Sequence, residues 1–375
     1  MDAPPRFSRH TLTLIILVTV VMIALMGQQG REKNIDLPPP PQFKITALRT
    51  DSGTPLWFIA KPSSPSLARL SCLAGSAFAP DGAAYALQQL LNQQARRQNI
   101  PLIAELDRDN LYLNMQFSQD PWQLKKQLDA LRGLLWQPQL DNSELQALRD
   151  LPLLPPASDS LFASLPAHPY RASLLPTAEQ LGTLTRLQIQ QFAQAYLHPA
   201  RCQLTLLADL APNAAQVLAE TLLPVSSHAA SQTVMPPLPH AVIAGGISMP
   251  PLSPGDNISL LVLAAWAGNN SINLQRNALG AGQVWQIPAG FVQQVDDGDL
   301  KNSLNDAKKQ LVKRWLQNLD EPAALLQTLS TLQRQGAPVN FFDEGYALLR
   351  ALDSGTLRAT ADTWFNPPQN GTSKQ

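Results

Sequence analysis

The sequence has no charge excess, little cysteine and no clustered histidines. Lys and Arg total 28 and Asp and Glu total 28, so the formal net charge is zero, and charged residues make up only 15%. This balance excludes the basic surface by which proteins bind nucleic acids. A surface so poor in charge also indicates that a partner protein covers part of it.

The lack of clustered histidines limits the catalytic sites that the chain can form. No two histidines are four residues apart, as a helical metal site requires, and no G-x-S-x-G segment for a nucleophilic serine occurs. We therefore expect His168 and His198, each next to a proline, to be turn residues. The histidines are His10, His168, His198, His228 and His240.

The two cysteines, Cys72 and Cys202, each lie in a strand-like run, Leu70–Leu73 and Cys202–Leu207. In an oxidising compartment they permit one disulfide, provided that their Cα atoms come within about 7 Å of each other. The sequence does not show whether the two strands are neighbours. Two buried thiols are the expectation, and a disulfide is the alternative.

One long hydrophobic run, residues 11–27, stands apart from the rest of the chain. No charged side chain occurs between Thr11 and Gly30, and about 20 apolar residues suffice to cross a bilayer core. The run also lacks the polar stripe of a core helix. Its exit, Ala24–Gln28, fits a signal-peptide cleavage site poorly, so we expect an uncleaved transmembrane anchor rather than a signal peptide.

The charges that flank this run indicate its orientation. Arg6 and Arg9 precede it, whereas Arg31 and Lys33 follow it and are offset by acidic neighbours. The positive-inside rule then places residues 1–10 in the cytoplasm and the bulk of the chain in the periplasm or an equivalent extracytoplasmic space. We expect a single-pass protein of the inner membrane.

Length and local patterns predict two domains after the anchor. Prolines 38–41 make residues 28–42 a stiff spacer, and a Pro- and Ser-rich stretch predicts a linker. The predicted parts are a first domain at 43–222, the linker at 223–240, a shorter second domain at 241–366 and a disordered tail at 367–375.

Alternating and helical patterns indicate an α+β fold rather than a doubly wound parallel sheet. Strands are predicted at residues 43–48, 55–60, 67–73, 110–117, 202–207 and 241–248. Helices are predicted at residues 82–97, 122–135, 142–150, 187–196, 258–266, 300–319, 322–336 and 341–352. A proline-rich loop is predicted at residues 151–166.

Three phrases of the sequence, in the correct order, resemble segments of the pitrilysin or insulinase family of metallopeptidases, the inverted zincins. The first is Ala74–Ala77 followed by Gly82–Gln89, the second runs from His168 to Asp209, and the third runs from Asp306 to Leu326. The resemblance spans residues 43–365. It implies two insulinase-like α/β roll domains, the second shortened between Gly290 and Leu300.

The resemblance points to zinc chemistry at a motif that this chain has lost. In the family, H-x-x-E-H supplies two imidazole ligands and a glutamate that polarises the attacking water. Here the segment reads Tyr85-Ala86-Leu87-Gln88-Gln89. A phenol and an amide are poor zinc ligands, and Gln88 cannot accept the proton that a general base takes.

We therefore expect Tyr85, Gln88 and Gln89 to be degenerate active-site positions, with no catalytic residue, no zinc and no other cofactor. A retained binding role at these positions is one interpretation. The alternative is that Tyr85 packs in the core and the two glutamines only solvate a helix.

The resemblance matches the remaining family positions less closely. The third zinc ligand of the family is a glutamate on a downstream helix, and the matching region, Glu144–Asp150, is shortened, with Asp150 as the candidate. An arginine and a tyrosine of the second repeat hold the substrate carbonyl in the family. They correspond to Arg276 and Gln283, which are therefore possible substrate contacts.

The resemblance, together with the missing zinc ligands and general base, implies a non-catalytic function. Four such units enclose a peptide in the family, whereas this chain supplies two. We expect a membrane-anchored, non-catalytic subunit that pairs with a catalytic zinc peptidase of the family to enclose peptide substrates. The alternatives are a stand-alone peptide-binding or scaffold protein of the cell envelope and a metallopeptidase with a non-standard site. The sequence defines neither the substrate nor the partner.

Overall fold

The computed structural model describes residues 37–41, 43–62, 65–79, 81–138, 141–150, 159–225, 231, 233–295 and 297–366. The predicted cytoplasmic residues 1–10, the anchor at 11–27 and the tail at 367–375 lie outside this part of the chain. Among the residues described, no helix combines the length and the apolarity needed to cross a bilayer. The elements below belong to one compact unit, residues 39–375.

The first half of this unit is built on a six-stranded sheet with the order β1-β2-β6-β3-β5-β4. Neighbouring strands run antiparallel except β2 and β6, which are parallel. The strands are β1 (Ile45–Arg49), β2 (Pro55–Ala60), β3 (Ser66–Cys72), β4 (Leu102–Leu106), β5 (Leu111–Phe117) and β6 (Cys202–Ala208).

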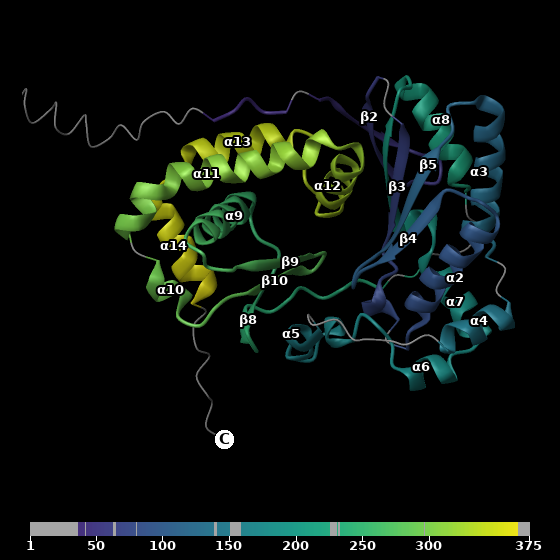
Figure 1. Cartoon of the computed structure of the whole chain (residues 1–375), viewed down its shortest axis with the longest axis horizontal. Helices are drawn as coiled ribbons and strands as arrows, with labels where there is room; N and C mark the ends of the chain where they lie inside the picture. The colour runs from purple at the N-terminus through teal and green to yellow at the C-terminus, as the bar shows by residue number, and fades with distance from the viewer. Residues whose placement is uncertain are drawn as a thin grey trace, which may run out of the picture. The chain divides into compact units, whose positions relative to one another are not determined.

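Six helices surround one face of this sheet. They are α2 (Ala83–Arg97), α3 (Pro121–Trp136), α4 (Asn142–Arg149), α6 (Ala178–Thr183), α7 (Arg186–Tyr196) and α8 (Pro212–Leu222). Leu56 and Phe58 of β2 point into the core that these helices cover, because side chains alternate along a strand. Figure 1 shows α2, α3, α7 and α8 on the same side of the strands.

The opposite face of the sheet packs against a helix from the second half of the chain. Trp57 and Ile59, the alternate residues of β2, belong to a separate apolar cluster with Leu325 and Leu329 of α12 (Pro322–Arg334). Two polar contacts accompany it: the hydroxyls of Ser71 and Ser330 lie 2.6 Å apart, and Thr205 donates to Gln333 at 2.9 Å. Figure 1 shows α12 beside β3, across the sheet from α8.

The second half contains a smaller antiparallel sheet with the order β7-β8-β10-β9. Its strands are β7 (Ala241–Ile243), β8 (Gly246–Met249), β9 (Gln275–Leu279) and β10 (Gly282–Gln286). Its helices are α9 (Pro254–Asn269), α10 (Phe291–Gln294), α11 (Asp297–Asp320), α13 (Phe341–Ala351) and α14 (Ser354–Phe365), and α9 packs against α11, α13 and α14. A short helix, α5 (Asp159–Ala163), lies between the two sheets in sequence.

The end of the proline run contacts α13. The hydroxyl of Tyr346 donates to the carbonyl of Pro39 at 3.4 Å, and the rings of Phe43 and Phe342 meet edge to face, with centroids 5.5 Å apart. Pro39 and Phe43 therefore contact the folded unit. The stiff spacer at 28–42 stays a prediction.

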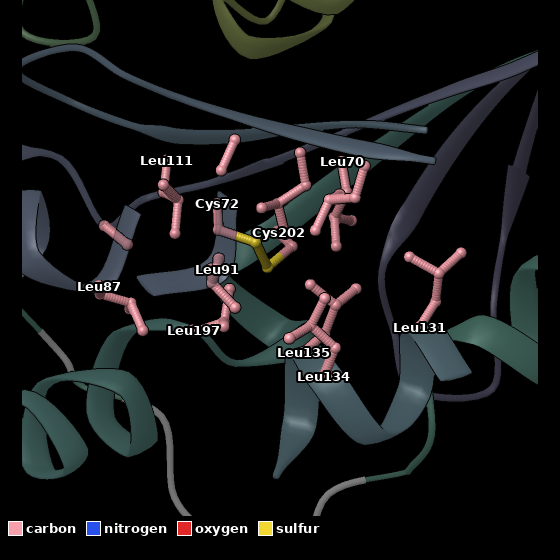
Figure 2. Close-up of a cluster of buried hydrophobic side chains, with 14 of the residues drawn as sticks. Leu70, Cys72, Leu87, Leu91, Leu111, Leu131, Leu134, Leu135, Leu197 and Cys202 are labelled. Carbon is pink, nitrogen blue, oxygen red and sulfur yellow. A yellow bond between two sulfur atoms is a disulfide. The ribbon is translucent and has the colours of Figure 1, made fainter. Parts of the chain in front are cut away.

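Cys72 and Cys202 form a disulfide, so the expectation of two free thiols was wrong. The two residues stand directly opposite each other on β3 and β6, with Cα atoms 3.9 Å apart. Both are buried among the leucines of the first core, as Figure 2 shows. The pairing depends on a strand register between segments 130 residues apart, which local sequence patterns do not contain.

The α+β class is confirmed, and most predicted elements appear within a few residues of their predicted ends. The single strand predicted at 241–248 is instead the hairpin of β7 and β8, because Gly245 adopts a positive φ of 76° and reverses the chain. The proline-rich loop contains α5, and β4, β9, β10, α6, α8, α10 and α14 were not predicted. The domain boundaries at 222 and 241 stay a prediction.

Candidate functional site

The segment that resembles the zinc motif lies on α2, and the residues that lead into this helix are tightly packed. Gly75, just after β3, has no room for a side chain, since an added Cβ would lie 2.3 Å from the carbonyl oxygen of Arg108. Gly82 precedes the helix with a φ of 91°, which favours glycine. The carboxylate of Asp81 then accepts from the backbone N–H of Ala83 at 3.1 Å. Gly75 thus lies against the β4–β5 turn, whereas Asp81 and Gly82 define the start of α2.

Tyr85 is a core residue rather than a ligand. Its side chain is only 8% exposed and belongs to the apolar cluster of the first half. Burial raises the pKa of its phenol, which keeps the hydroxyl protonated and unsuited to a cation. The interpretation that Tyr85 simply packs in the core agrees with this placement.

The amides of Gln88 and Gln89 are engaged in hydrogen bonds within the protein. Gln88 Nε2 donates to the carbonyl of Ala104 on β4 at 2.9 Å, and Gln89 Nε2 donates to Gln88 Oε1 at 2.9 Å. The Gln88 oxygen therefore already accepts a hydrogen bond. One turn further along α2, Asn92 also reaches Ala104.

Asn92 pairs with both backbone groups of Ala104 in the edge strand β4. Its Oδ1 accepts from the Ala104 N–H at 2.7 Å and its Nδ2 donates to the Ala104 carbonyl at 2.9 Å. Strand β4 has β5 as its only sheet neighbour among the strands described. The face of α2 that would carry zinc ligands thus supplies side-chain partners to an open sheet edge, which needs them.

The downstream acidic residues do not complete a metal site on α2. Glu144 of α4 is 3% exposed, and its carboxylate accepts from Gln94 at 3.0 Å and forms an ion pair with Arg97, near the opposite end of the helix from Tyr85. Asp150, the candidate third ligand, is an exposed residue that ends α4.

Zinc does not fit this set of residues. Tyr85 is buried with a protonated phenol, and Gln88 and Gln89 are bonded to Ala104 and to each other. In the described part of the chain, no group of three or more His, Cys, Asp or Glu residues is placed to hold a metal ion. We therefore derive no zinc-dependent step for this chain.

The histidines described are structural, as predicted for two of them. His168 and His198 each begin a 3-10 helix with proline at its first position, and Nδ1 of each ring accepts a backbone N–H two residues further on. His240 contacts the carbonyl of Trp364 at 3.0 Å and packs on its indole ring.

The structure brings together the two predicted substrate-contact residues, Arg276 and Gln283. They are diagonal neighbours across the β9–β10 hairpin, and Arg276 Nε donates to Gln283 Oε1 at 2.6 Å. Arg276 Nη2 also donates to Asn257 Oδ1 of α9 at 2.9 Å. Burial lowers the pKa of Arg276 to about 10, which leaves the guanidinium charged at neutral pH.

These residues line a cavity of about 180 Å³. Its walls come from the start of α9 and the segment before it, the β9–β10 hairpin, and α13 with the turn that precedes it. Tyr85, Gln88 and Gln89 are not among its lining residues. The predicted site residues thus divide into a structural set on α2 and a cavity on the second sheet.

A buried acidic centre, which the sequence reasoning missed, joins the two sheets. Asp109 is 2% exposed; its carboxylate accepts from the hydroxyl of Tyr170 and from the backbone N–H of Gly280, the latter at 2.8 Å. Burial raises its pKa, although the charge of Arg334 opposes the rise. Its partners Tyr170 and Gly280 lie far away in sequence, so no local pattern indicated the centre.

Known proteins resemble this chain in structure rather than in sequence. No protein-family profile matches it, and no curated protein matches it. A protein from Pseudomonas fluorescens described as a peptidase M16 inactive domain superposes with a TM-score of 0.66 at 13% identity, over 85% of this chain and 94% of that chain.

Two proteases show the same likeness. The periplasmic protease PqqL from Escherichia coli gives a TM-score of 0.65 at 12% identity, over 88% of this chain but only 47% of its own. A protease from Helicobacter pylori gives 0.65 at 12% identity, over 87% of this chain and 97% of that chain. The fold that the three sequence phrases implied is confirmed: the chain has the pitrilysin and insulinase fold of the M16 peptidases.

Proposed function

We propose that this chain is a membrane-anchored, non-catalytic M16-fold subunit that pairs with a catalytic zinc peptidase of the same fold to enclose peptide substrates. One observation carries the proposal. The M16 fold is retained, while the residues at the zinc-motif positions, Tyr85, Gln88 and Gln89, are committed to the core and to contacts with β4 and each other. A chain of this kind keeps the walls of a peptide chamber without its chemistry.

The solved neighbours support the pairing. The superposition with PqqL includes 88% of this chain and 47% of PqqL, so that protease contains about twice as much chain as the part that this chain matches. The Pseudomonas fluorescens match is itself described as an inactive domain. A second M16-fold subunit would supply further units of the chamber and the zinc site.

The disulfide supports a location outside the cytoplasm. Disulfides such as Cys72–Cys202 persist in oxidising compartments, including the bacterial periplasm. This agrees with the orientation predicted from the charges around residues 11–27, and PqqL is a periplasmic protein. The proposed anchor then keeps the subunit at the inner membrane.

Co-purification from the native cells tests the pairing. The full-length protein, solubilised in mild detergent, should recover a second M16-fold polypeptide that carries an intact H-x-x-E-H segment, at a fixed ratio. A monodisperse monomer with no such polypeptide would refute the pairing. Metal analysis of the isolated chain should give no stoichiometric zinc.

A stand-alone peptide-binding protein is the second candidate, and the cavity at Arg276 favours it. This cavity combines apolar walls with the guanidinium of Arg276 within the chain itself, which suits a small ligand. Measured peptide affinity separates the two candidates. Binding that is as tight for the isolated chain as for the complex favours the stand-alone function, since a half-chamber alone should bind weakly.

A further inference from the structure

The cavity at Arg276 has the size of one residue and mostly apolar walls. Its volume is about 180 Å³, and a cavity of roughly 150 Å³ holds a benzene molecule. It therefore accommodates one apolar group and not a length of chain. Its apolar walls include Pro250, Leu252, Ile258, Leu279, Phe341 and Leu348.

The cavity also contains a cation that lacks a counterion. The guanidinium of Arg276 bonds only to the neutral side-chain oxygens of Gln283 and Asn257, and no carboxylate of the described residues forms an ion pair with it. Arg276 is half-buried, and a charge that is partly removed from water without an opposite charge is unfavourable. An anion bound beside Arg276 would offset that penalty.

The two amide partners also orient the guanidinium. Gln283, which is 3% exposed, holds Nε, and Asn257 holds Nη2, whereas Nη1 has no hydrogen bond to the described residues. A fixed guanidinium fork with free N–H groups binds a carboxylate through parallel hydrogen bonds. Because the fork is already positioned, little side-chain entropy is lost on binding.

We infer that the Arg276 cavity binds a carboxylate that carries a small apolar group, as the last residue of a peptide chain does. The carboxylate sits on Arg276 and the apolar group fills the cavity. This inference deepens the peptide-binding part of the proposed function and rests on it, but it does not require a partner subunit.

One acidic residue at the cavity acts against such a ligand. Glu344 lies in the first turn of α13, is exposed and lines the cavity. Its carboxylate repels an incoming anion, an effect that exposure to water weakens but does not remove. Glu344→Gln should therefore bind the carboxylate more tightly than the wild type.

Isothermal titration of the full-length protein in mild detergent tests the inference with three probes. These are acetyl-Ala-Ala-Leu with a free carboxylate, the same tripeptide with a C-terminal amide, and hexanoate, an apolar acid without peptide bonds. We expect the free tripeptide to bind at least about tenfold more tightly than its amide, because the amide loses the charge-assisted pair.

Variants of Arg276 test the same site. Arg276→Gln should lose at least about tenfold in affinity for the free tripeptide, and Arg276→Lys, which keeps the charge without the fork, should fall between it and the wild type. Arg96→Gln, on the exposed end of α2, is the matched control and should bind like the wild type. Thermal unfolding of each variant shows whether it is folded.

The outcomes are distinguishable. Equal binding of hexanoate and the free tripeptide supports the carboxylate site and assigns it to free apolar acids, which would contradict the peptide source. Equal binding of acid and amide, unchanged binding by a folded Arg276→Gln, or no binding of any probe at millimolar concentration overturns the site. Pairing with a catalytic relative is measured by co-purification and is unaffected by these results.

Discussion

At the scale of single residues, Gln88 shows how the α2 segment differs from a catalytic one. Its amide donates to the carbonyl of Ala104 at 2.9 Å, a contact that a carboxylate cannot make. A zinc peptidase needs a glutamate at this position. Its carboxylate would lie against the carbonyl oxygen of Ala104. The loss of the motif is thus coupled to the attachment of β4.

Gln88→Glu should therefore destabilise the protein by about 1–3 kcal/mol near neutral pH, because a donor is lost and a carboxylate faces a carbonyl. The neighbouring carbonyl should raise the pKa of the introduced carboxyl in the folded state, so the penalty should shrink as the pH falls and the protonated group donates again. Denaturant unfolding at several pH values measures this. Gln89→Glu, whose parent amide bonds only to Gln88, is the control and should change stability less; a penalty that is independent of pH would contradict the mechanism.

At the scale of elements, the edge of β4 is protected by a side chain instead of a further strand. Asn92→Ala should leave the N–H of Ala104 without its side-chain partner and the carbonyl with Gln88 alone, and cost about 1–3 kcal/mol. Hydrogen exchange of the Ala104 amide should accelerate, whereas Gln89→Ala should leave it unchanged. An unaltered exchange rate in Asn92→Ala would show that the edge is protected in another way.

The disulfide also holds elements together, since it joins the neighbouring strands β3 and β6 across 130 residues of sequence. Replacing both Cys72 and Cys202 by alanine should lower the free energy of unfolding by about 2–5 kcal/mol, mainly because the unfolded chain regains the freedom that a long loop loses. Chemical denaturation with and without a reductant measures the effect. The wild type under reducing conditions should approach the variant, and the variant should not respond to the reductant.

The elements that were predicted well carry local signals. Thr185 caps α7 with Gln188 in a capping box, and the spacing of these two residues is a signal within the local sequence. The elements that were missed lack such signals: Gln275–Leu279 of β9 shows no alternation of polar and apolar residues. It is a strand because β10 folds back on it at Gly280–Gly282, a contact that propensity does not encode.

At the scale of the whole molecule, contacts distant in sequence decide the site. Arg276 and Gln283 were predicted as a pair from a family resemblance, and the structure shows that a hairpin brings them together. Asn257, their third member, lies on a preceding helix, and no pattern in the sequence indicated it. The centre at Asp109 was missed for the same reason, because it draws on residues from 109 to 334.

Asp109 connects the two sheets through Tyr170 and Gly280, so its titration affects the stability of the whole molecule. Burial, helped by the charge of Asp107 and opposed by Arg334, raises its pKa above the ordinary 3.8. A carboxyl that binds its proton more firmly in the folded state contributes less stability as the pH rises through that interval. The free energy of unfolding of the wild type minus that of Asp109→Asn should therefore fall as the pH rises above the ordinary pKa of a free aspartate and through the raised pKa of Asp109.

Denaturant titrations of both proteins at each pH measure this difference, and comparison with the variant cancels the titration of all other groups that the substitution leaves unperturbed. Glu179→Gln, an exposed change in the first turn of α6, is the control and should give a nearly constant difference. A difference that rises with pH would mean that Arg334 outweighs burial.

The hydrogen bond between Tyr346 and Pro39 has a mechanical consequence. Tyr346 and Phe342, which hold the chain where it joins the compact unit, both belong to α13. The same helix forms one wall of the cavity at Arg276 through Phe341, Glu344 and Leu348. A pulling force applied upstream of Pro39 is therefore transmitted first to the helix that shapes the ligand cavity, so tension on the chain and occupancy of the cavity act on a single element.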